Sequence, residues 1–356
     1  MNKFSLFLSL LEPEMFGLSK NFQVESQLQD LSNEENSILI RRIKEDMVDF
    51  NGNDLFPKRY PSTIKFELSP KEKELYRRVS QYVKVNYNMA LNQKRKTVAF
   101  ALIMLQRRLS SSIRAIKKSL IRRKKRLESV RESDFVKNYG VNELIEIEKK
   151  YRNILDTEDL DDLSEKERWE IEKKLETLTM AQNLEELKYE INLLEELIDL
   201  AENIESSGEE TKLQNLWKTL KEEIRDKHEK LIIFTEFRDT LEYLRENISD
   251  WGFQVVVIHG KMSMDERIRA EHQFRQEKQI LIATEAAGEG INLQFCWLMV
   301  NYDIPWNPNR LEQRMGRIHR YLQTHDCYIY NCIAENTMEG KVFIRINSEI
   351  VLTFYS

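Results

Sequence analysis

A short arginine-rich segment, QRMGRIHR at residues 313–320, carries the residue types best suited to chemistry. If the segment is helical, Arg317 and Arg320 lie on one face of a single turn, because residues three apart are neighbours on a helix surface. A fixed pair of guanidinium groups matches the charge that develops on a transferring phosphoryl group. The segment therefore predicts a role in nucleotide hydrolysis. The alternative is an ordinary solvated helix face.

A loop to hold the phosphates of that nucleotide is missing from the 356 residues. The phosphate-loop pattern G-x-x-x-x-G-K-[ST] occurs nowhere in the sequence. We therefore expect another polypeptide segment to hold the nucleotide. We also expect this chain by itself to bind nucleotide weakly and to hydrolyse essentially none.

Five short apolar runs are the elements that must position the arginines. They lie at residues 231–234, 255–258, 280–283, 297–300 and 327–330, and helical patterns separate most of them. This alternation predicts a parallel α/β sheet with helices on both faces. Ligands of such sheets bind beyond the carboxyl ends of the strands. The loops that follow the five runs are therefore the candidate site.

Three of these loops carry candidate residues. Thr284, followed by Gly288 and Gly290, offers a hydroxyl and a backbone that a phosphate can approach closely. The alternative for this loop is a plain strand-to-helix turn. Lys261 can meet a phosphate as a point charge, although a surface lysine in a turn is the simpler interpretation. Asn307 is expected to cap the arginine helix, with a proline in its first turn.

The first part of the chain is predicted to be mostly helical. Residues 63–68 alternate like a strand, and the Ser-Pro-Lys-Glu of residues 69–72 is typical of a helix start. Residues 94–226 are nearly free of glycine and rich in helix formers. A heptad seam predicts a helical hairpin or short coiled coil, and residues 205–208 are the clearest linker. The seam consists of Leu184, Leu187, Ile191, Leu194, Ile198 and Ala201.

A dense basic segment lies within residues 98–127, and the acidic residues gather after it. Two interpretations stand beside each other: a face that contacts the backbone of duplex DNA, or a helix paired against the acidic helices behind it. The basic residues are Arg107, Arg108, Arg114, Lys117, Lys118, Arg122, Arg123, Lys124, Lys125 and Arg126.

Composition excludes several classes of protein. Hydrophobic residues make up 41% and charged residues 32% of the chain, as in a globular protein rich in surface helix. The net charge of −5 argues against a uniformly basic nucleic-acid coat. The three cysteines show no paired spacing, so we expect buried thiols in the cytoplasm and no zinc site. No apolar run approaches the ~20 residues of a membrane span.

At these residues the sequence resembles a known family, the superfamily-two helicases and translocases. Residues 208–343 resemble its second RecA-like lobe. The segment at 313–320 resembles motif six, that at 284–293 resembles motif five, and that at 230–236 resembles motif four.

The branch is indicated by further segments. The DIPWNP of residues 303–308, together with the Gln and the His-Arg ending of motif six, resembles the Swi/Snf branch and within it the RapA/HepA-like members. Residues 38–76 resemble the connector between the two lobes. The resemblance implies a connector with a remnant of the preceding lobe at 1–76, a helical insertion at 77–207 and the RecA-like lobe at 208–356.

The resemblance also implies roles for single residues. Arg317 and Arg320 would be catalytic arginine fingers that reach the γ-phosphate held by the first lobe. Four positions would serve the nucleotide or the geometry of the fingers: Gly290, Asn292, Gln313 and Arg314. Four positions would grip the nucleic-acid backbone: Thr235, Lys261, Thr284 and Asn307.

The implied activity is ATP-driven translocation on double-stranded DNA. ATP and magnesium would be bound mainly by the first lobe, which this sequence does not contain. The implied partners are duplex DNA, that first lobe and a protein–DNA complex such as RNA polymerase. The alternative from another class is a non-catalytic module that binds nucleic acid or protein through its helical arm. An RNA helicase is a weaker option, disfavoured by the DIPWNP segment.

Overall fold

The computed structural model describes residues 47–92, 96–132, 184–225, 229–285 and 291–340, and in addition Lys44, Glu167 and Ala181. The chain consists of two compact units, Met1–Phe56 and Pro57–Ser356. The helices and strands named below belong to the second unit. Within the described residues, no helix is both long and apolar enough to cross a membrane.

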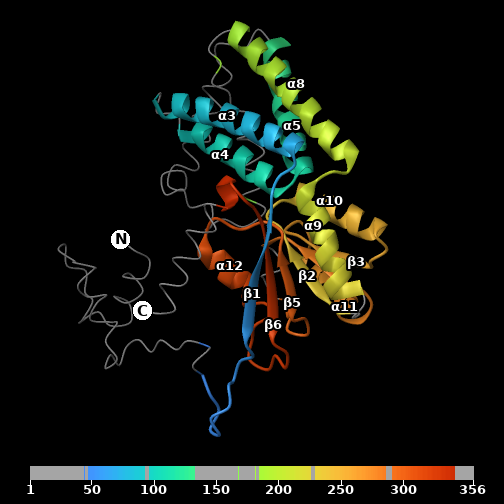
Figure 1. Ribbon diagram of the computed structural model, residues 1–356. Coiled ribbons are helices and arrows are strands. Elements are labelled where there is room, and N and C mark those ends of the chain that lie inside the picture. Colours follow the sequence, from blue (N-terminus) through green and yellow to red (C-terminus); the bar gives the residue numbers. More distant parts are fainter. Residues whose placement is uncertain are drawn as a thin grey trace, which may run out of the picture. The chain divides into compact units, whose positions relative to one another are not determined.

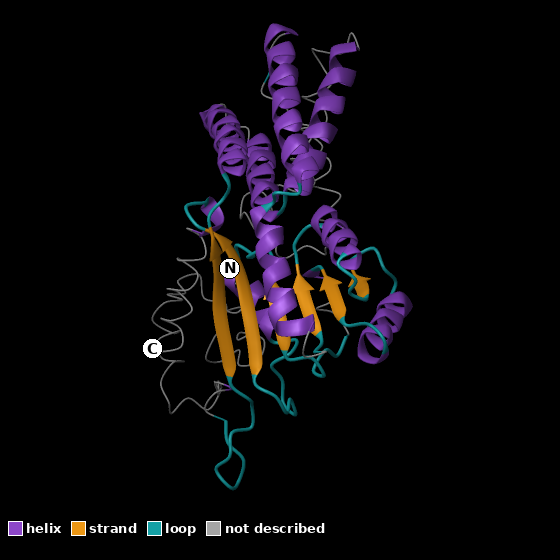
Figure 2. Cartoon of the chain, turned by 45° about the vertical axis from the view of Figure 1, so that its right-hand side comes forward, coloured by secondary structure: helices purple, strands orange, loops and turns teal. Residues whose placement is uncertain are grey.

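Six parallel strands form one sheet in the order β1-β6-β5-β2-β4-β3 (Figure 2). The strands are β1 (Arg59–Phe66), β2 (Leu231–Phe234), β3 (Val255–Ile258), β4 (Ile280–Ala283), β5 (Leu298–Asn301) and β6 (Cys327–Ala334). Because both faces are covered, β2, β4 and β5 are buried along their whole length. All five apolar runs that we predicted to be strands are confirmed.

The strand at the edge of the sheet comes from the residues before the helical region. β1 pairs with β6 in register from Arg59↔Cys327 to Phe66↔Ala334. The sequence pattern had placed this strand at 63–68, and it begins and ends earlier. The segment that we assigned to the connector thus completes the sheet.

Helices cover both faces of the sheet, as the doubly wound pattern predicted. One face packs against α9 (Thr211–Leu220), the π-helical turn η3 (Lys221–Arg225) and α10 (Arg238–Asp250). The other face packs against α11 (Met264–Gln276) and α12 (Pro308–Met315). These two apolar clusters hold the strands in place and so position the strand ends at which the candidate loops begin.

A separate helical region lies between β1 and α9 (Figure 1). It contains α3 (Pro70–Asn92), α4 (Lys96–Ser111), α5 (Ile113–Glu132) and α8 (Leu184–Ser207), which share their own apolar core. The heptad seam of α8 is buried from Leu187 to Ala201, but its first member, Leu184, is exposed. The predicted linker is shorter than expected, because α8 continues to Ser207 and only Gly208 turns the chain, at φ 65°.

One carboxylate ties together the two places where the chain enters and leaves this region. Glu72 and Ser69 form a reciprocal capping box at the start of α3, with N–H donors at 2.7 and 3.3 Å. The same carboxylate accepts from the backbone N–H of Thr211 at 2.9 Å and from the Thr211 hydroxyl. Glu210, the N-cap residue of α9, makes no side-chain cap of its own. The helix start predicted at residues 69–72 is confirmed, and its glutamate serves two helices.

We expect Glu72→Ala to lower the free energy of unfolding by about 2–4 kcal/mol, because three buried or half-buried donors at two helix starts lose their acceptor. Urea denaturation followed by circular dichroism measures this change. Glu74→Ala, in the same helix but at an exposed ion pair with Arg77, serves as the control and should leave the midpoint unchanged. Equal effects of the two variants would contradict the double cap.

Candidate functional site

The carboxyl ends of three neighbouring strands form the centre of the candidate site. Phe234 of β2 pairs with Ala283 of β4 on one side and with Asn301 of β5 on the other. The loops after these strands therefore start at one level. They present Thr235, Thr284 and Asp303 within two residues of the strand ends, as expected for a parallel sheet.

The side chain of Arg314 connects these loops to α12. It is 1% exposed, and its guanidinium forms an ion pair with Glu285 after β4, with an Nε–Oε1 distance of 2.9 Å. Its Nη1 donates to the Asp303 carbonyl at 2.7 Å and to Asn301 at 3.4 Å. The planar fork of an arginine suits several acceptors at fixed angles. Arg314 thus holds the arginine segment to the sheet from inside the lobe.

The helix that carries Arg314 begins where the sequence predicted and ends earlier. Asn307 caps α12, accepting from the Asn309 N–H at 2.9 Å, and Pro308 occupies the first turn. The helix ends at Met315 with Gly316 as its C-cap. The expectation of Arg317 and Arg320 on one helical turn is therefore wrong: both lie in the turns that follow the helix.

Buried neighbours determine the path of these turns. Ile318 and His319, 0% and 1% exposed, point into the lobe between the two arginines. His319 Nε2 lies 2.8 Å from the Pro57 carbonyl oxygen just before β1. The amide of Gln323 donates to the carbonyls of Gln294, Cys296 and Ile318 at 2.7–3.2 Å. Tertiary anchors thus replace the helix as the support for the arginines.

Both predicted finger residues are half-buried on this anchored segment. The Arg320 Nε donates to the Gly316 carbonyl at 3.1 Å, which orients its guanidinium group. Within the described part of the chain, Arg320 pairs with no carboxylate. A partly exposed guanidinium on a fixed backbone is able to meet an anion that arrives from outside the lobe.

The remaining predicted residues are distributed between the interior and the surface. Thr235 and Thr284 are fully buried, and the Thr235 hydroxyl donates to Asp303. Lys261, Gln313 and Asn292 are exposed, and Asn292 accepts from the Gln294 N–H within its own loop at 3.0 Å. Gly290, with Gly288, lies outside the described residues.

Two residues of the site were given no role from the sequence, although one of them, Asp303, opens the DIPWNP segment. Asp303 lies two residues beyond β5, and Lys212 lies in the first turn of α9; they are 3% and 5% exposed. The position of Asp303 just after a strand was a usable signal. Nothing in the sequence distinguishes Lys212 from a surface lysine.

The basic segment does not form an open positive face. Most of its side chains form ion pairs with acidic residues of α8 and α10 or of the loop after β2. These pairs are Arg107–Glu236, Arg108–Asp239, Arg114–Glu205 and Glu246, Lys117–Glu205, Lys118–Asp239, Arg122–Asp239, Arg123–Glu190 and Lys124–Glu195. Arg123 is completely buried. Of the two interpretations of this segment, the structure favours the paired one.

Metal ligation has no support in the described ranges, where no three His, Cys, Asp or Glu side chains are grouped to hold a metal ion. All three cysteines are buried, and burial raises the pKa of Cys296 and of Cys332 to about 12. Cys296 and Cys332 are therefore neutral thiols at physiological pH.

We expect Arg314→Ala to lower the free energy of unfolding by about 3–5 kcal/mol, because Glu285 is left with an uncompensated charge at a largely buried position. Arg314→Lys should recover only part of the loss, since an ammonium cannot reach the same set of acceptors. Chemical denaturation measures both. Arg320→Ala is the matched control in the same segment and should be nearly neutral; a large loss for Arg320→Ala would contradict this division of roles.

Acid should weaken the contact between the helical region and the lobe. Burial disfavours the charged form of Asp239, but the cations of α4 and α5 outweigh it and hold the pKa below the usual 3.8. The stabilisation is therefore complete above about pH 4 and is lost as the pH falls through the lower, folded-state pKa. Asp239→Asn should cost about 3 kcal/mol at pH 7 and flatten this acid limb.

Thermal unfolding at pH 2–7 tests this pH dependence. Asp250→Asn, at the exposed end of α10, is the control and should follow the wild-type profile. An Asp239→Asn variant that keeps the full acid dependence would show that other carboxylates cause it.

Comparison with known proteins agrees with this architecture. Residues 212–322 match the model of the helicase conserved C-terminal domain. The chain is 47% identical over 124 residues to the "Uncharacterized ATP-dependent helicase YqhH" of Bacillus subtilis (strain 168), a match that covers 35% of this chain and 22% of that protein. It is 34% identical over 127 residues to the "ATP-dependent DNA helicase DDM1" of Arabidopsis thaliana, covering 35% of this chain and 17% of that protein.

A third relative is the "RNA polymerase-associated protein RapA" of Serratia proteamaculans (strain 568), 34% identical over 121 residues, which are 33% of this chain and 12% of that protein. The matched segment thus spans less than a quarter of each of these relatives. A crystal structure of the C-terminal part of the Fun30 ATPase domain shares the fold, with a TM-score of 0.51 and 21% identity over 81% of this chain and 89% of that one.

The six-stranded parallel sheet, the family match and the relatives lead to one conclusion. Residues 212–322 match the helicase conserved C-terminal domain, their parallel α/β sheet has the RecA-like fold of the Fun30 ATPase fragment, and the chain is similar in sequence to Snf2-type helicases.

Proposed function

We propose that this chain supplies the second RecA-like lobe of an ATP-driven motor that translocates on double-stranded DNA or remodels a protein–DNA complex. The observation that carries the proposal is Arg320: its guanidinium is half-buried, sits on a turn fixed by buried anchors, and pairs with no carboxylate in the described part of the chain. The names of two relatives, an ATP-dependent helicase and an ATP-dependent DNA helicase, support the choice of ATP and DNA.

The chemistry assigned to this chain is electrostatic. ATP and magnesium would be held mainly by a first lobe that carries a phosphate loop, and magnesium would neutralise phosphate charge there. When the lobes close, Arg317 and Arg320 would meet the γ-phosphate, where such fingers contribute about 10³–10⁵ in rate. The residues of this chain fit the arginine side of an ATP site, since two guanidinium groups are present. They do not fit the side that binds the phosphates and magnesium, since the phosphate-loop motif does not occur in the sequence.

Contact with DNA is assigned to the exposed carboxyl edge. Lys261 follows β3 and is exposed, so it can meet a backbone phosphate as a point charge. The buried Thr235 and Thr284 would support that edge from below. Asn307 is half-buried, and its side-chain oxygen Oδ1 accepts from the Asn309 N–H in the cap of α12. A complex that contains RNA polymerase is a candidate target, because one relative is named for that association.

The alternative of a non-catalytic module is less well supported in its nucleic-acid form. The basic side chains of α5 that would have bound DNA are largely engaged with α8 and α10. A phosphate track along this helix would require these ion pairs to be exchanged for contacts with DNA.

The proposal is tested by an ATPase assay in which the chain is mixed with a separately produced RecA-like lobe that carries a phosphate loop, with and without duplex DNA. We expect activity only in the mixture, stimulated by DNA. Arg320→Ala should lower kcat by about 10³-fold or more, because transition-state charge loses a partner.

The matched control is Arg269→Ala, an exposed arginine on α11 whose Nε donates to the Asp265 carbonyl within its own helix. Its rate should equal that of the wild type. Robust DNA-stimulated hydrolysis by the chain alone, or an Arg320→Ala variant with full activity, would overturn the proposed function.

A further inference from the structure

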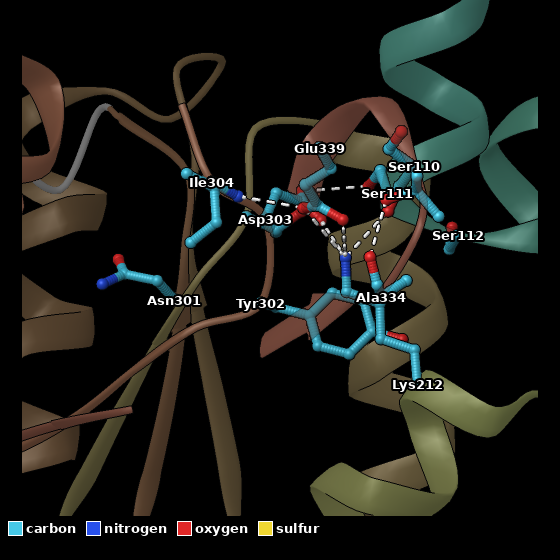
Figure 3. A network of polar contacts seen from close by, with 12 residues as sticks. Ser110, Ser111, Ser112, Lys212, Asn301, Tyr302, Asp303, Ile304, Ala334 and Glu339 are labelled. Carbon is cyan, nitrogen blue, oxygen red and sulfur yellow. Dashed lines mark hydrogen bonds and ion pairs between the residues drawn. The ribbon is translucent and has the colours of Figure 1, made fainter. Parts of the chain in front are cut away.

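The corner between α4 and α5 reaches the carboxyl edge of the sheet, although it belongs to the helical region (Figure 3). Its three serines, Ser110, Ser111 and Ser112, lie against residues of the lobe. The hydroxyls of Ser111 and Ser112 are 2.6 and 2.8 Å from the hydroxyl of Thr240 in α10. Both serines are buried, so these contacts are not exchanged with water.

Asp303 is the residue of the lobe on which this corner acts. Its Oδ2 accepts from the Ser111 hydroxyl at 2.9 Å, from the Glu236 N–H at 2.9 Å and from the Thr235 hydroxyl. Its backbone carbonyl accepts from Arg314 at 2.7 Å. Asp303 therefore contacts the helical region through its side chain and Arg314 of α12 through its backbone carbonyl.

The buried ammonium group of Lys212 adds further contacts between the α4–α5 corner and the lobe. The Lys212 ammonium donates to the Ser110 carbonyl at 2.8 Å and lies 3.3 Å from Glu339 Oε1 and 3.6 Å from Asp303 Oδ1. Burial disfavours its charge, but the two carboxylates hold the pKa of Lys212 above its usual value. Glu339 Oε1 accepts in turn from the Ile304 N–H at 3.2 Å. The corner, α9 and the loop after β5 thus share one charge cluster.

Helix α4 adds contacts on the other side of this loop. Arg107 pairs with Glu236 at 2.5 Å and lies over the ring of Trp306, 5.6 Å from its centroid. Trp306 immediately precedes the cap of α12. The helical region therefore contacts both ends of the segment that leads into α12: Ser111 contacts Asp303, and Arg107 contacts Trp306.

We propose that the α4–α5 corner positions the arginine-bearing segment, with Ser111 acting through Asp303 and Arg314. A rotation of the helical region would have to break buried polar contacts or carry the loop after β5 with it. Breaking them is costly, because a buried polar group without a partner retains its full desolvation penalty. Movement of the helices therefore changes the placement of Arg317 and Arg320. The inference rests on the proposed function only in that these arginines assist hydrolysis.

The test uses Ser111→Ala, which removes one donor to Asp303 together with the contact to the Thr240 hydroxyl, and leaves the contacts of Asp303 with Thr235 and Glu236. The control is Ser129→Ala, an exposed serine of α5 whose hydroxyl donates to the Arg126 carbonyl. The full chain is labelled with 5-fluorotryptophan, and the Trp306 resonance is assigned with Trp306→Phe. We expect Ser111→Ala to shift or broaden the Trp306 signal and to leave unchanged that of Trp251, which packs against Trp217 of α9.

In the two-lobe ATPase mixture, Ser111→Ala should lower kcat about tenfold with KM for ATP unchanged, because one buried hydrogen bond that holds the segment is lost. Ser129→Ala should change neither readout. If Ser111→Ala matches Ser129→Ala in both the fluorine spectrum and kcat, the positioning role is wrong. If Arg320→Ala leaves kcat unchanged, the proposed function is overturned instead. The Trp306 fluorine signal of Ser111→Ala then still shows whether the α4–α5 corner is coupled to the segment that leads into α12.

Discussion

The buried guanidinium of Arg314 is the interaction on which the carboxyl edge of this lobe depends. A charge that is 1% exposed must be compensated by fixed partners, and it finds them in Glu285 after β4 and in Asn301 and Asp303 of β5 and its loop. Because these partners come from different strands, the two loops and α12 cannot move independently. The strand ends, held level by the parallel register, thereby determine where the chain enters the turns with Arg317 and Arg320.

The helical region belongs to the same network and is not an independent appendage. Its basic side chains face α10 and the loop after β2, and its serine corner meets Asp303. Polar contacts of this kind specify one arrangement more sharply than apolar packing does, since each donor has few acceptable partners. A change in the position of the helices can therefore reach the loop after β5 through Ser111 and Asp303, without any change in the sheet.

Elements with local signals could be predicted from the sequence, and features that depend on distant partners could not. A few adjacent residues are enough to indicate the apolar strands, the capping box at Ser69 and the cap at Asn307. The end of α12 depends on burial of Ile318 and His319, which no helix signal reveals. The ion pairs of the basic segment join residues far apart in sequence, so its charge pattern alone left two interpretations open. The burial of Lys212 had no sequence signal.

The double cap at Glu72 has a consequence for how this architecture can diversify. Since the outgoing Ser69 and the returning Thr211 bind the same carboxylate, the ends of the inserted helices are held next to each other whatever lies between them. Lengthening, shortening or exchanging the intervening hairpins would change the entropic cost of closing that loop only slightly, about 0.6 kcal/mol for each doubling of its length, and would leave both caps in place. A fold whose insertion is closed at its base in this way can carry inserted segments of different length at the same position in the chain.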